Sequence, residues 1–403
     1  MKRWLNLAIL MVLSFCIALG LSAAFSPSHA ASTYNWQLPA WTPPPIVPAN
    51  NPMSAAKVEL GRHLFYEKRL SVTGEFSCAT CHDQSRAFTE KKSVSIGATG
   101  EAHPRNSMSL ANVAYNSVLT WANPLMTDLE TQLLVPLFGE HPIEMGMAGK
   151  ETELIAMLKA DPNYQKLFAA AFGNEEISIN TMAKAIASFE RSLISFNSPY
   201  DQYRYGGNDR AISEAAKRGE ALFESERLEC FHCHGGINFS DSIKHSRLAF
   251  QESAFHNTGL YNLDGKGAYP PNNTGIKEIT LKPSDMGRFK APTLRNIAVT
   301  APYMHDGSIQ TLEKVIEHYE AGGRTIHAGQ WAGIGSQNPL KSSFVRGFKL
   351  SDREKQDLLE FLRSLTDQSL IQNPAFSDPH LDRGAAAPRN IPSVLRSSSI
   401  SSQ

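Results

Sequence analysis

The sequence predicts a mainly α-helical protein made of two related domains joined by long loops. Apolar residues recur every three or four positions in most of the periodic segments, and few stretches alternate with period two. The pattern Gly-x-x-Leu-Phe occurs at residues 61–65 and again at 219–223, each time shortly before a pair of cysteines. This repetition indicates an internal duplication, and 403 residues are enough for two ordinary domains.

The first 30 residues are predicted to be a secretory signal peptide. They combine a basic start, a long apolar run, and small residues at Ser28 and Ala30, where a signal peptidase would cut. The leader carries Lys2 and Arg3 and no acid, so cleavage leaves 39 − 2 = 37 basic and 39 acidic residues, a net charge of about −2. An uncleaved membrane anchor is the alternative. We expect a periplasmic protein with no membrane attachment after cleavage, and the balanced charge gives no reason to expect a nucleic-acid partner.

The first domain is expected to span residues 31–205. One amphipathic helix should run through the first Gly-x-x-Leu-Phe pattern into the first cysteine pair. Further apolar periodicity predicts helices at 128–138, 151–171 and 178–195. Tyrosine, glycine, proline and asparagine then accumulate between 198 and 208, which places the domain boundary there.

The second domain, residues 206–368, contains a helix whose sequence is TLEKVIEHYEAGG. Leu312, Val315 and Ile316 form an apolar stripe, and Tyr319 continues it, whereas His318 lies about 100° around the helix. A glycine pair at 322–323 ends the segment. A tyrosine at the inner end of such a stripe is most often a core residue, so the stripe alone does not assign it a function.

The last predicted helix, 351–365, closes the second domain. Ser351 followed by Glu354 is the pattern of a capping box at its start, and its leucines give it one buried face. Residues 369–403 are rich in serine, proline and alanine with little periodicity. They are expected to form a loose tail.

Two copies of Cys-x-x-Cys-His carry the strongest chemical signal in the chain. Of five cysteines, Cys16 leaves with the leader, and the remaining four belong to these motifs. The pattern is the attachment signature of c-type haem, in which two thiols bind the vinyl groups and the histidine binds the iron. A pair of disulfides is the alternative, but it leaves both histidines unexplained. We therefore predict two covalently bound c-type haems in two cytochrome c-like domains, held by Cys78, Cys81 and His82 and by Cys230, Cys233 and His234.

Four further motifs resemble the bacterial di-haem cytochrome c peroxidase and MauG superfamily over about residues 50–366. They are R-N-S (105–107), H-P-I-E-M (141–145), R-F-K-A-P-T-L-R-N (288–296) and T-A-P-Y-M-H-D-G (300–307). The stretches NPMSAAKVELGRHLFY and MSLANVAYN look most like MbnH-type enzymes, relatives of MauG that oxidise a tryptophan on a companion protein. The resemblance implies that the first haem meets peroxide and the second passes electrons.

The resemblance also implies an open first haem. Family members that must be reduced before they act hold a histidine eight residues before the asparagine of R-N, and here that position is Ala98, counted from Asn106. His103, three residues before Asn106, is the alternative as a displaced ligand. The favoured interpretation is that His82 alone holds the first iron.

At the second haem the family's peroxidases place a methionine 17 residues after the proline of T-x-P. Counting from Pro302 gives Tyr319, as in MauG-like enzymes. Methionine favours the reduced metal, whereas anionic tyrosinate stabilises high oxidation states. The resemblance therefore selects Tyr319, and not His318, as the second ligand of the iron held by His234.

Other family positions carry over one at a time. Glu144 matches a general acid–base above the first haem, and Trp121 matches a tryptophan between the haems. Without the resemblance, a surface carboxylate and a packed core tryptophan would be the simpler interpretations. A calcium ion between the haems is implied at Asn106, Thr300 and Pro302.

Leu228 stands where MauG has a surface tryptophan that relays charge to its substrate, so the route by which charge would leave this protein is not assigned. His305 in YMHDG is expected near the second haem.

These observations predict a periplasmic di-haem oxidoreductase of the MauG/MbnH type. Hydrogen peroxide would generate a high-valent di-haem state that oxidises a residue, by resemblance a tryptophan, on a small periplasmic protein, with a copper-binding protein as one such partner. The alternative is a cytochrome c peroxidase that takes electrons from a small redox protein. A non-enzymatic electron carrier is a third possibility, and Ala98 disfavours it.

Overall fold

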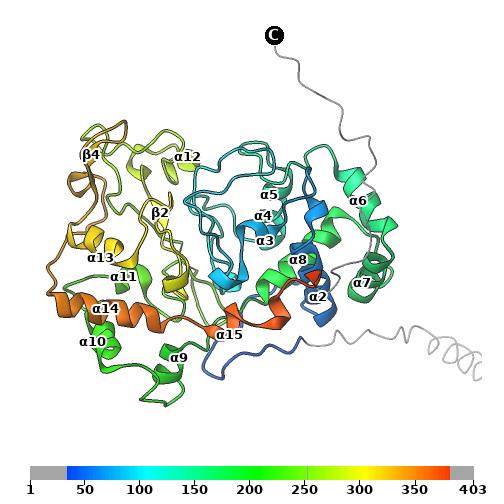
Figure 1. Ribbon diagram of the computed structural model, residues 1–403, viewed down its shortest axis with the longest axis horizontal. Helices are drawn as coiled ribbons and strands as arrows, with labels where there is room; N and C mark the ends of the chain where they lie inside the picture. The colour runs from blue at the N-terminus through cyan, green and yellow to red at the C-terminus, as the bar shows by residue number, and fades with distance from the viewer. Residues whose placement is uncertain (1–33, 252, 382–403) are drawn as a thin grey trace, which may run out of the picture.

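A computed structural model describes residues 34–251 and 253–381 (Figure 1). The predicted leader, with Cys16, and the last part of the predicted tail lie outside these residues. The prediction of a mainly helical protein is confirmed, and the helices gather into two groups around two hydrophobic cores. Within the described residues no helix is long and apolar enough to cross a membrane.

From residue 34 onward, where the structure describes the chain, the N-terminal half contains seven α-helices that surround the first core. Leu60, Leu64 and Phe65 on the first of them are fully buried against Phe189 and its neighbours. The helices are α2 (Ala55–Phe65), α3 (Cys78–Cys81), α4 (Leu129–Gln132), α5 (Leu134–Phe138), α6 (Glu151–Ala160), α7 (Pro162–Phe172) and α8 (Ile179–Arg191).

Two predicted helices are each split in two, and proline explains both breaks. The segment predicted as 128–138 forms α4 and α5, because Pro136 has no N–H to donate to the carbonyl of Gln132. The segment predicted as 151–171 divides before Pro162, where Asp161 caps the new helix by accepting the N–H of Asn163. The third, predicted as 178–195, ends earlier, at Arg191.

The C-terminal half surrounds the second core with short helices and two small antiparallel β-ribbons. The capping box predicted at Ser351 and Glu354 is confirmed. The helices are α9 (Pro199–Arg204), α10 (Glu214–Phe223), α11 (Phe231–His234), α12 (Lys277–Thr280), α13 (Leu312–Glu320) and α14 (Asp352–Ser364). The ribbons pair β1 (Phe255–His256) with β2 (Phe289–Lys290), and β3 (Thr325–Ile326) with β4 (Gly333–Ile334).

The two halves share one packing device, which is consistent with a duplication. In each half the helix before the cysteine pair crosses a later helix at a glycine. A Cβ on Gly61 of α2 would overlap the carbonyl of Ala185 on α8, and a Cβ on Gly219 of α10 would overlap the carbonyl of Asp357 on α14. The absence of a side chain therefore lets each pair of backbones touch.

The chain after residue 368 is not loose as far as the structure describes it, so that part of the prediction is wrong. A further helix, α15 (Gln368–Ile371), lies between α14 and α2 (Figure 1), and its Leu370 is fully buried in the first core. Tyr66 Oη donates to the carbonyl of Phe376 at 2.7 Å, and Arg62 donates to that of Ser377 at 2.9 Å. These bonds join the segment after α15 to helix α2 and its C-terminal end in the N-terminal half.

A buried ion pair fixes the second half near its boundary with the first. Arg295 is 1% exposed, and its guanidinium contacts both carboxylate oxygens of Asp201 at 2.8 and 2.9 Å. Asp201 belongs to α9, and its neighbour Tyr200 packs in the second core although it precedes the expected boundary. The bidentate geometry compensates both charges for the loss of water.

Candidate active site

The first Cys-x-x-Cys-His motif forms the short helix α3 and the residue after it. Nδ1 of His82 donates to the carbonyl of Phe88 at 2.8 Å, which leaves Nε2 without a proton and free to bind a metal. Burial lowers the pKa of His82, so the ring is neutral, as a ligand must be.

The second motif forms α11 and has the same arrangement. Nδ1 of His234 lies 3.2 Å from the carbonyl of Phe239 and 3.1 Å from that of Pro292, so it carries the proton and Nε2 is free. Burial lowers the pKa of this histidine too. None of the four described cysteines forms a disulfide, so the alternative interpretation of the motifs finds no support in the described residues.

A largely apolar cavity of about 210 Å³ lies beside the second motif. Its walls include Cys230, Cys233 and His234 together with Tyr319 and the apolar stripe of α13. His318 is buried elsewhere, with Nε2 3.1 Å from the carbonyl of Thr258. Tyr319 therefore lines the same cavity as His234, whereas His318 does not.

Polar atoms in this cavity fit a haem group. Two thiols and one neutral histidine are the donors that a c-type haem requires. His305 is 5% exposed, its Nε2 has no hydrogen-bond partner among the residues that the structure describes, and burial lowers its pKa to about 3. Lys290 is 2% exposed, burial lowers its pKa to about 7, and its one hydrogen bond goes to the carbonyl of Val118 at 3.0 Å. Lys290 and Nε2 of His305 are buried without a full set of hydrogen-bond partners among the described residues. Such groups are suited to contact the anionic propionates of a haem.

Trp121 connects this cavity to the first half of the chain. Its Nε1 donates to the carbonyl of Asn106 at 2.7 Å, and its own carbonyl accepts the N–H of Lys290 at 2.8 Å. Asn106, Thr300 and Pro302, the residues predicted to bind calcium, also line the cavity. The structure thus brings the indole and all three predicted calcium ligands together beside the second motif.

Glu144, which the resemblance assigns as an acid–base, lies near enough to the first motif for its charge to act on Cys78 and Cys81. Burial, then the charge of Glu90 and, as a smaller contribution, the charge of Glu144 raise the pKa of the Cys81 thiol to about 11. Burial and then Glu90 raise the pKa of Glu144 itself to about 7. The N–H of Ala98 donates to the carbonyl of Glu144 at 2.6 Å. Ala98, where the resemblance would place a distal histidine, is therefore bonded to the backbone of Glu144.

His103 is also at this site. Its Nε2 lies 3.8 Å from Oε1 of Glu144, and both side chains are 29% exposed. Sequence reasoning missed this pairing and also missed the buried Lys290. A lysine inside the apolar run of R-F-K-A-P was the one available signal for the latter.

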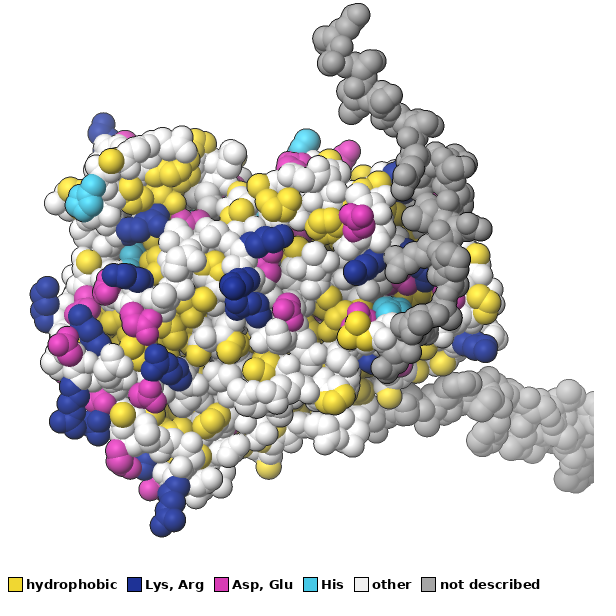
Figure 2. All heavy atoms as spheres, viewed as in Figure 1, with side chains coloured by type: hydrophobic (Ala, Val, Ile, Leu, Met, Phe, Trp, Pro, Cys, Tyr) yellow, Lys and Arg dark blue, Asp and Glu magenta, His cyan; other side chains and the backbone are white. Residues whose placement is uncertain are grey.

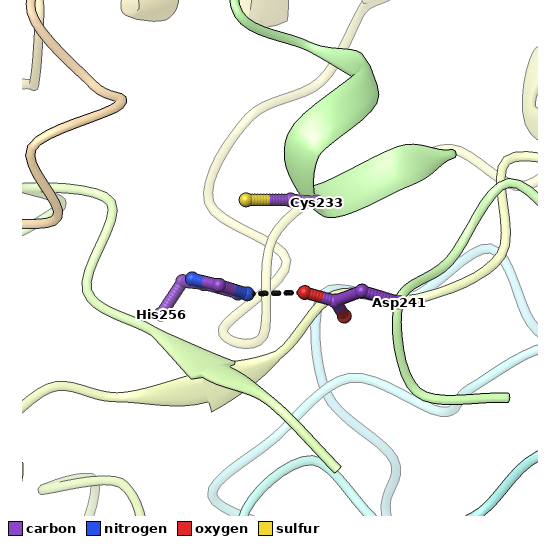
Figure 3. A group of neighbouring side chains, drawn as sticks. All are labelled: Cys233, Asp241 and His256. Atoms are coloured by element: carbon purple, nitrogen blue, oxygen red, sulfur yellow. Dashed lines mark hydrogen bonds and ion pairs between the residues drawn. The ribbon is translucent and has the colours of Figure 1, made fainter. Parts of the chain in front are cut away.

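Cys233, Asp241 and His256 form a cluster at the edge of the second motif (Figure 3). Burial alone would lower the pKa of His256, but hydrogen bonds to Asp241 and Cys233 outweigh it and raise this pKa to about 10. His256 and Asp241 therefore form an ion pair, with 2.5 Å between Nε2 and Oδ2. The histidine holds a proton and the thiol belongs to the haem motif. Cys233, Asp241 and His256 are therefore better suited to supporting the edge of a bound haem than to binding a metal ion.

Residue 228, where MauG has its charge-relaying surface tryptophan, is buried in this protein. Leu228, which stands where MauG has a surface tryptophan, is 4% exposed and lines the second cavity. His232, between the two thiols, faces outward, stacks on Phe344 with ring centroids 4.3 Å apart, and pairs with Glu229 at 2.7 Å.

Figure 2 shows basic and acidic side chains interspersed over one face of the molecule. That face therefore has no basic patch of the kind that binds nucleic acid.

Comparisons with known proteins agree with this geometry. The profile of the di-haem cytochrome c peroxidase family matches residues 55–210. MauG, the methylamine utilization protein of Methylophilus methylotrophus, is 33% identical over 330 residues, which cover 81% of this chain and 88% of that protein. The cytochrome-c peroxidase IdrP1 of Pseudomonas sp. (strain SCT) is 32% identical over 372 residues, which cover 89% of this chain and 91% of that protein.

Solved structures show the same relationship. A MauG-like protein associated with microbial copper homeostasis is 52% identical to this chain, with a TM-score of 0.84 over 86% of this chain and 99% of that protein. The diheme peroxidase BthA of Burkholderia thailandensis is 20% identical with a TM-score of 0.62, and it shows a common fold.

Proposed function

This chain belongs to the di-haem cytochrome c peroxidase and MauG family and is a peroxide-dependent oxidoreductase; from that premise we propose that it is an enzyme of the MauG/MbnH type. It would use hydrogen peroxide to oxidise a residue on a partner protein. Two c-type haems, one in each half of the chain, would be its cofactors, and the periplasm its location.

The observation that carries this proposal is the position of Tyr319. Tyr319 and His234 line the same cavity, so both side chains could serve as ligands of one haem bound there. Burial raises the pKa of this phenol, so it stays protonated until a metal cation replaces the proton. A tyrosinate ligand suits a site that stores oxidising power, whereas a thioether suits a donor of electrons.

The other side chains have separate tasks. Bound haem supplies the redox chemistry. His82 and His234 would hold the two groups through Nε2, and Glu144 would take a proton from one peroxide oxygen and return it to the other as the O–O bond breaks. Trp121, whose indole lines the second cavity and donates to the carbonyl of Asn106, would shorten the electron path between the two groups.

A calcium ion between the two halves is part of the proposal. Asn106 Oδ1 and the carbonyls of Thr300 and Pro302 accept no hydrogen bond among the described residues, although all three residues line the same cavity. Neutral oxygen atoms supplemented by water form a suitable calcium site. The ion would bind the segment after the first motif to the loop that faces the second.

We place the substrate among small periplasmic proteins that carry an oxidisable residue, most simply tryptophan. Support comes from the 52% identical MauG-like protein, which is associated with copper homeostasis. A partner that binds copper is therefore the first to test. The competing function, reduction of peroxide with electrons from a small redox protein, is supported by relatives named cytochrome-c peroxidases at a closely similar identity, 32% against 33%.

The test replaces the hydroxyl of Tyr319. In Y319F both haems should attach normally, but the near-infrared absorption that peroxide produces in the oxidised protein should be lost, because the anionic ligand is gone. The matched control is H318Q, which alters the neighbouring side chain outside the cavity and should leave the absorption intact. Retention of the absorption in Y319F would show that Tyr319 is not a ligand.

A further inference from the structure

We propose that His103 is a positioning residue that holds the carboxyl group of Glu144 in place in both of its protonation states. The proposal rests on the proposed function, because it concerns the same peroxide site. The family resemblance offers His103 only as a displaced iron ligand, and the structure instead places it against the acid–base.

The two side chains are close, and their backbones are fixed. Nε2 of His103 lies 3.8 Å from Oε1 of Glu144. The N–H of Ala98 bonds to the carbonyl of Glu144 at 2.6 Å, and the N–H of His103 bonds to the carbonyl of Ser95 at 2.8 Å. The gap exceeds a hydrogen bond, but a small rotation of either side chain or one water closes it, as is common before a substrate binds.

The other side of the ring explains how one histidine can serve both states. Nδ1 of His103 lies 3.1 Å from the N–H nitrogen of Arg105 and 3.1 Å from the carbonyl oxygen of the same residue. When Glu144 is ionised, Nδ1 accepts from that N–H, and Nε2–H donates to the carboxylate. When Glu144 is protonated, Nδ1–H donates to the carbonyl, and Nε2 accepts from the acid. Both tautomers are neutral, so each state of Glu144 finds a partner without burying a new charge.

The charged groups around the pair favour this neutral exchange. Glu90 acts on Glu144, and burial lowers the pKa of His103, which keeps the ring uncharged. The carboxylate of Glu101 accepts the N–H of Ile143 at 3.1 Å. The guanidinium of Arg105 bonds to Glu278 at 2.6 and 2.7 Å and is not available to Glu144.

The experiment compares H103L and H103Q, each in the wild-type and in the E144Q background. The rate of the optical change on adding peroxide to the oxidised holoprotein is measured from about pH 5 to pH 9, and the spin state of the ferric haems is recorded by electron paramagnetic resonance. Leucine has similar bulk but no polar atom, whereas the amide of glutamine can both donate and accept.

We expect H103L to slow the peroxide reaction about 10- to 100-fold in the wild-type background and to have no further effect in E144Q. H103Q should recover most of the rate. The inflection near pH 7 should move upward in H103L and stay in H103Q, because the lost hydrogen bond to a carboxylate is stronger than that to the neutral acid. The ferric spin states should not change.

Three outcomes would overturn the proposal. Equal slowing by H103L in both backgrounds, or glutamine as slow as leucine, would mean that His103 only supports the fold. Loss of a low-spin signal at the first haem in H103L would mean that His103 binds iron. Failure of the proposed function is a distinct result: if the oxidised wild-type protein ignores peroxide, the same variants measured after reduction of one haem still decide the role of His103.

Discussion

Single residues here take their chemistry from their surroundings, and Glu144 illustrates this most clearly. Sequence alone cannot distinguish it from the exposed Glu140 four positions earlier. Burial beside Glu90 raises the pKa of Glu144 to about 7, a value suited to a group that must both take and return a proton. The resemblance located this residue, but its partners come from segments far apart in the chain and required the structure.

A pH dependence follows from this pKa. The carboxylate is the form that accepts the first proton from peroxide, and a raised pKa means that this form is lost as pH falls through about 7. The rate of the optical change after peroxide addition should therefore rise between about pH 6 and pH 8 and level off above. E144Q should lower the rate about 10²- to 10⁴-fold and remove the inflection.

The matched control for this prediction is E140Q, which changes an exposed carboxylate in the same loop and should alter neither rate nor inflection. An inflection that persists in E144Q would assign the titration to another group.

At the scale of elements, local signals predicted the helices well and their ends less well. The capping box at Ser351 lies entirely within one turn, and it was found from sequence. The predictions joined α4 to α5 and α6 to α7 because apolar periodicity continues across Pro136 and Pro162, although neither residue can supply the missing N–H. The close crossings at Gly61 and Gly219 depend on partners more than 100 residues away, so the repeated glycine was visible but its reason was not.

The crossing of α10 and α14 gives a prediction of stability. G219A places a methyl group against the carbonyl of Asp357, so the free energy of unfolding should fall by about 1–3 kcal/mol, measured by denaturant titration of the holoprotein. In an uncrowded helix interior the same change would raise it by about 0.5–1 kcal/mol.

The control for that change is A221G, at an exposed position of the same helix, where only helix propensity is altered. It should cost about 0.5–1 kcal/mol. Stabilisation by G219A would show that the two backbones are farther apart than described.

For the whole molecule, the sequence predicted the residues that would attach the haems but not the long-range contacts that position them. The Cys-x-x-Cys-His motifs are local, so six attachment residues could be named at once, whereas Tyr319 needed a count along a family pattern. Lys290 and the packed segment after α14 were missed because their partners are distant. The result is a site in which Asn106 from the first half, Trp121 and the loop of Thr300 meet beside one cavity.

The central claim is that both haem sites act together on peroxide without prior reduction. It is tested most directly by the optical and near-infrared spectrum of the fully oxidised protein after one equivalent of hydrogen peroxide, with no reductant present. We predict a rapid change in the bands of both haems together with a near-infrared absorption from charge shared between them. A spectrum that stays unchanged until one haem has been reduced would contradict the account and favour a cytochrome c peroxidase.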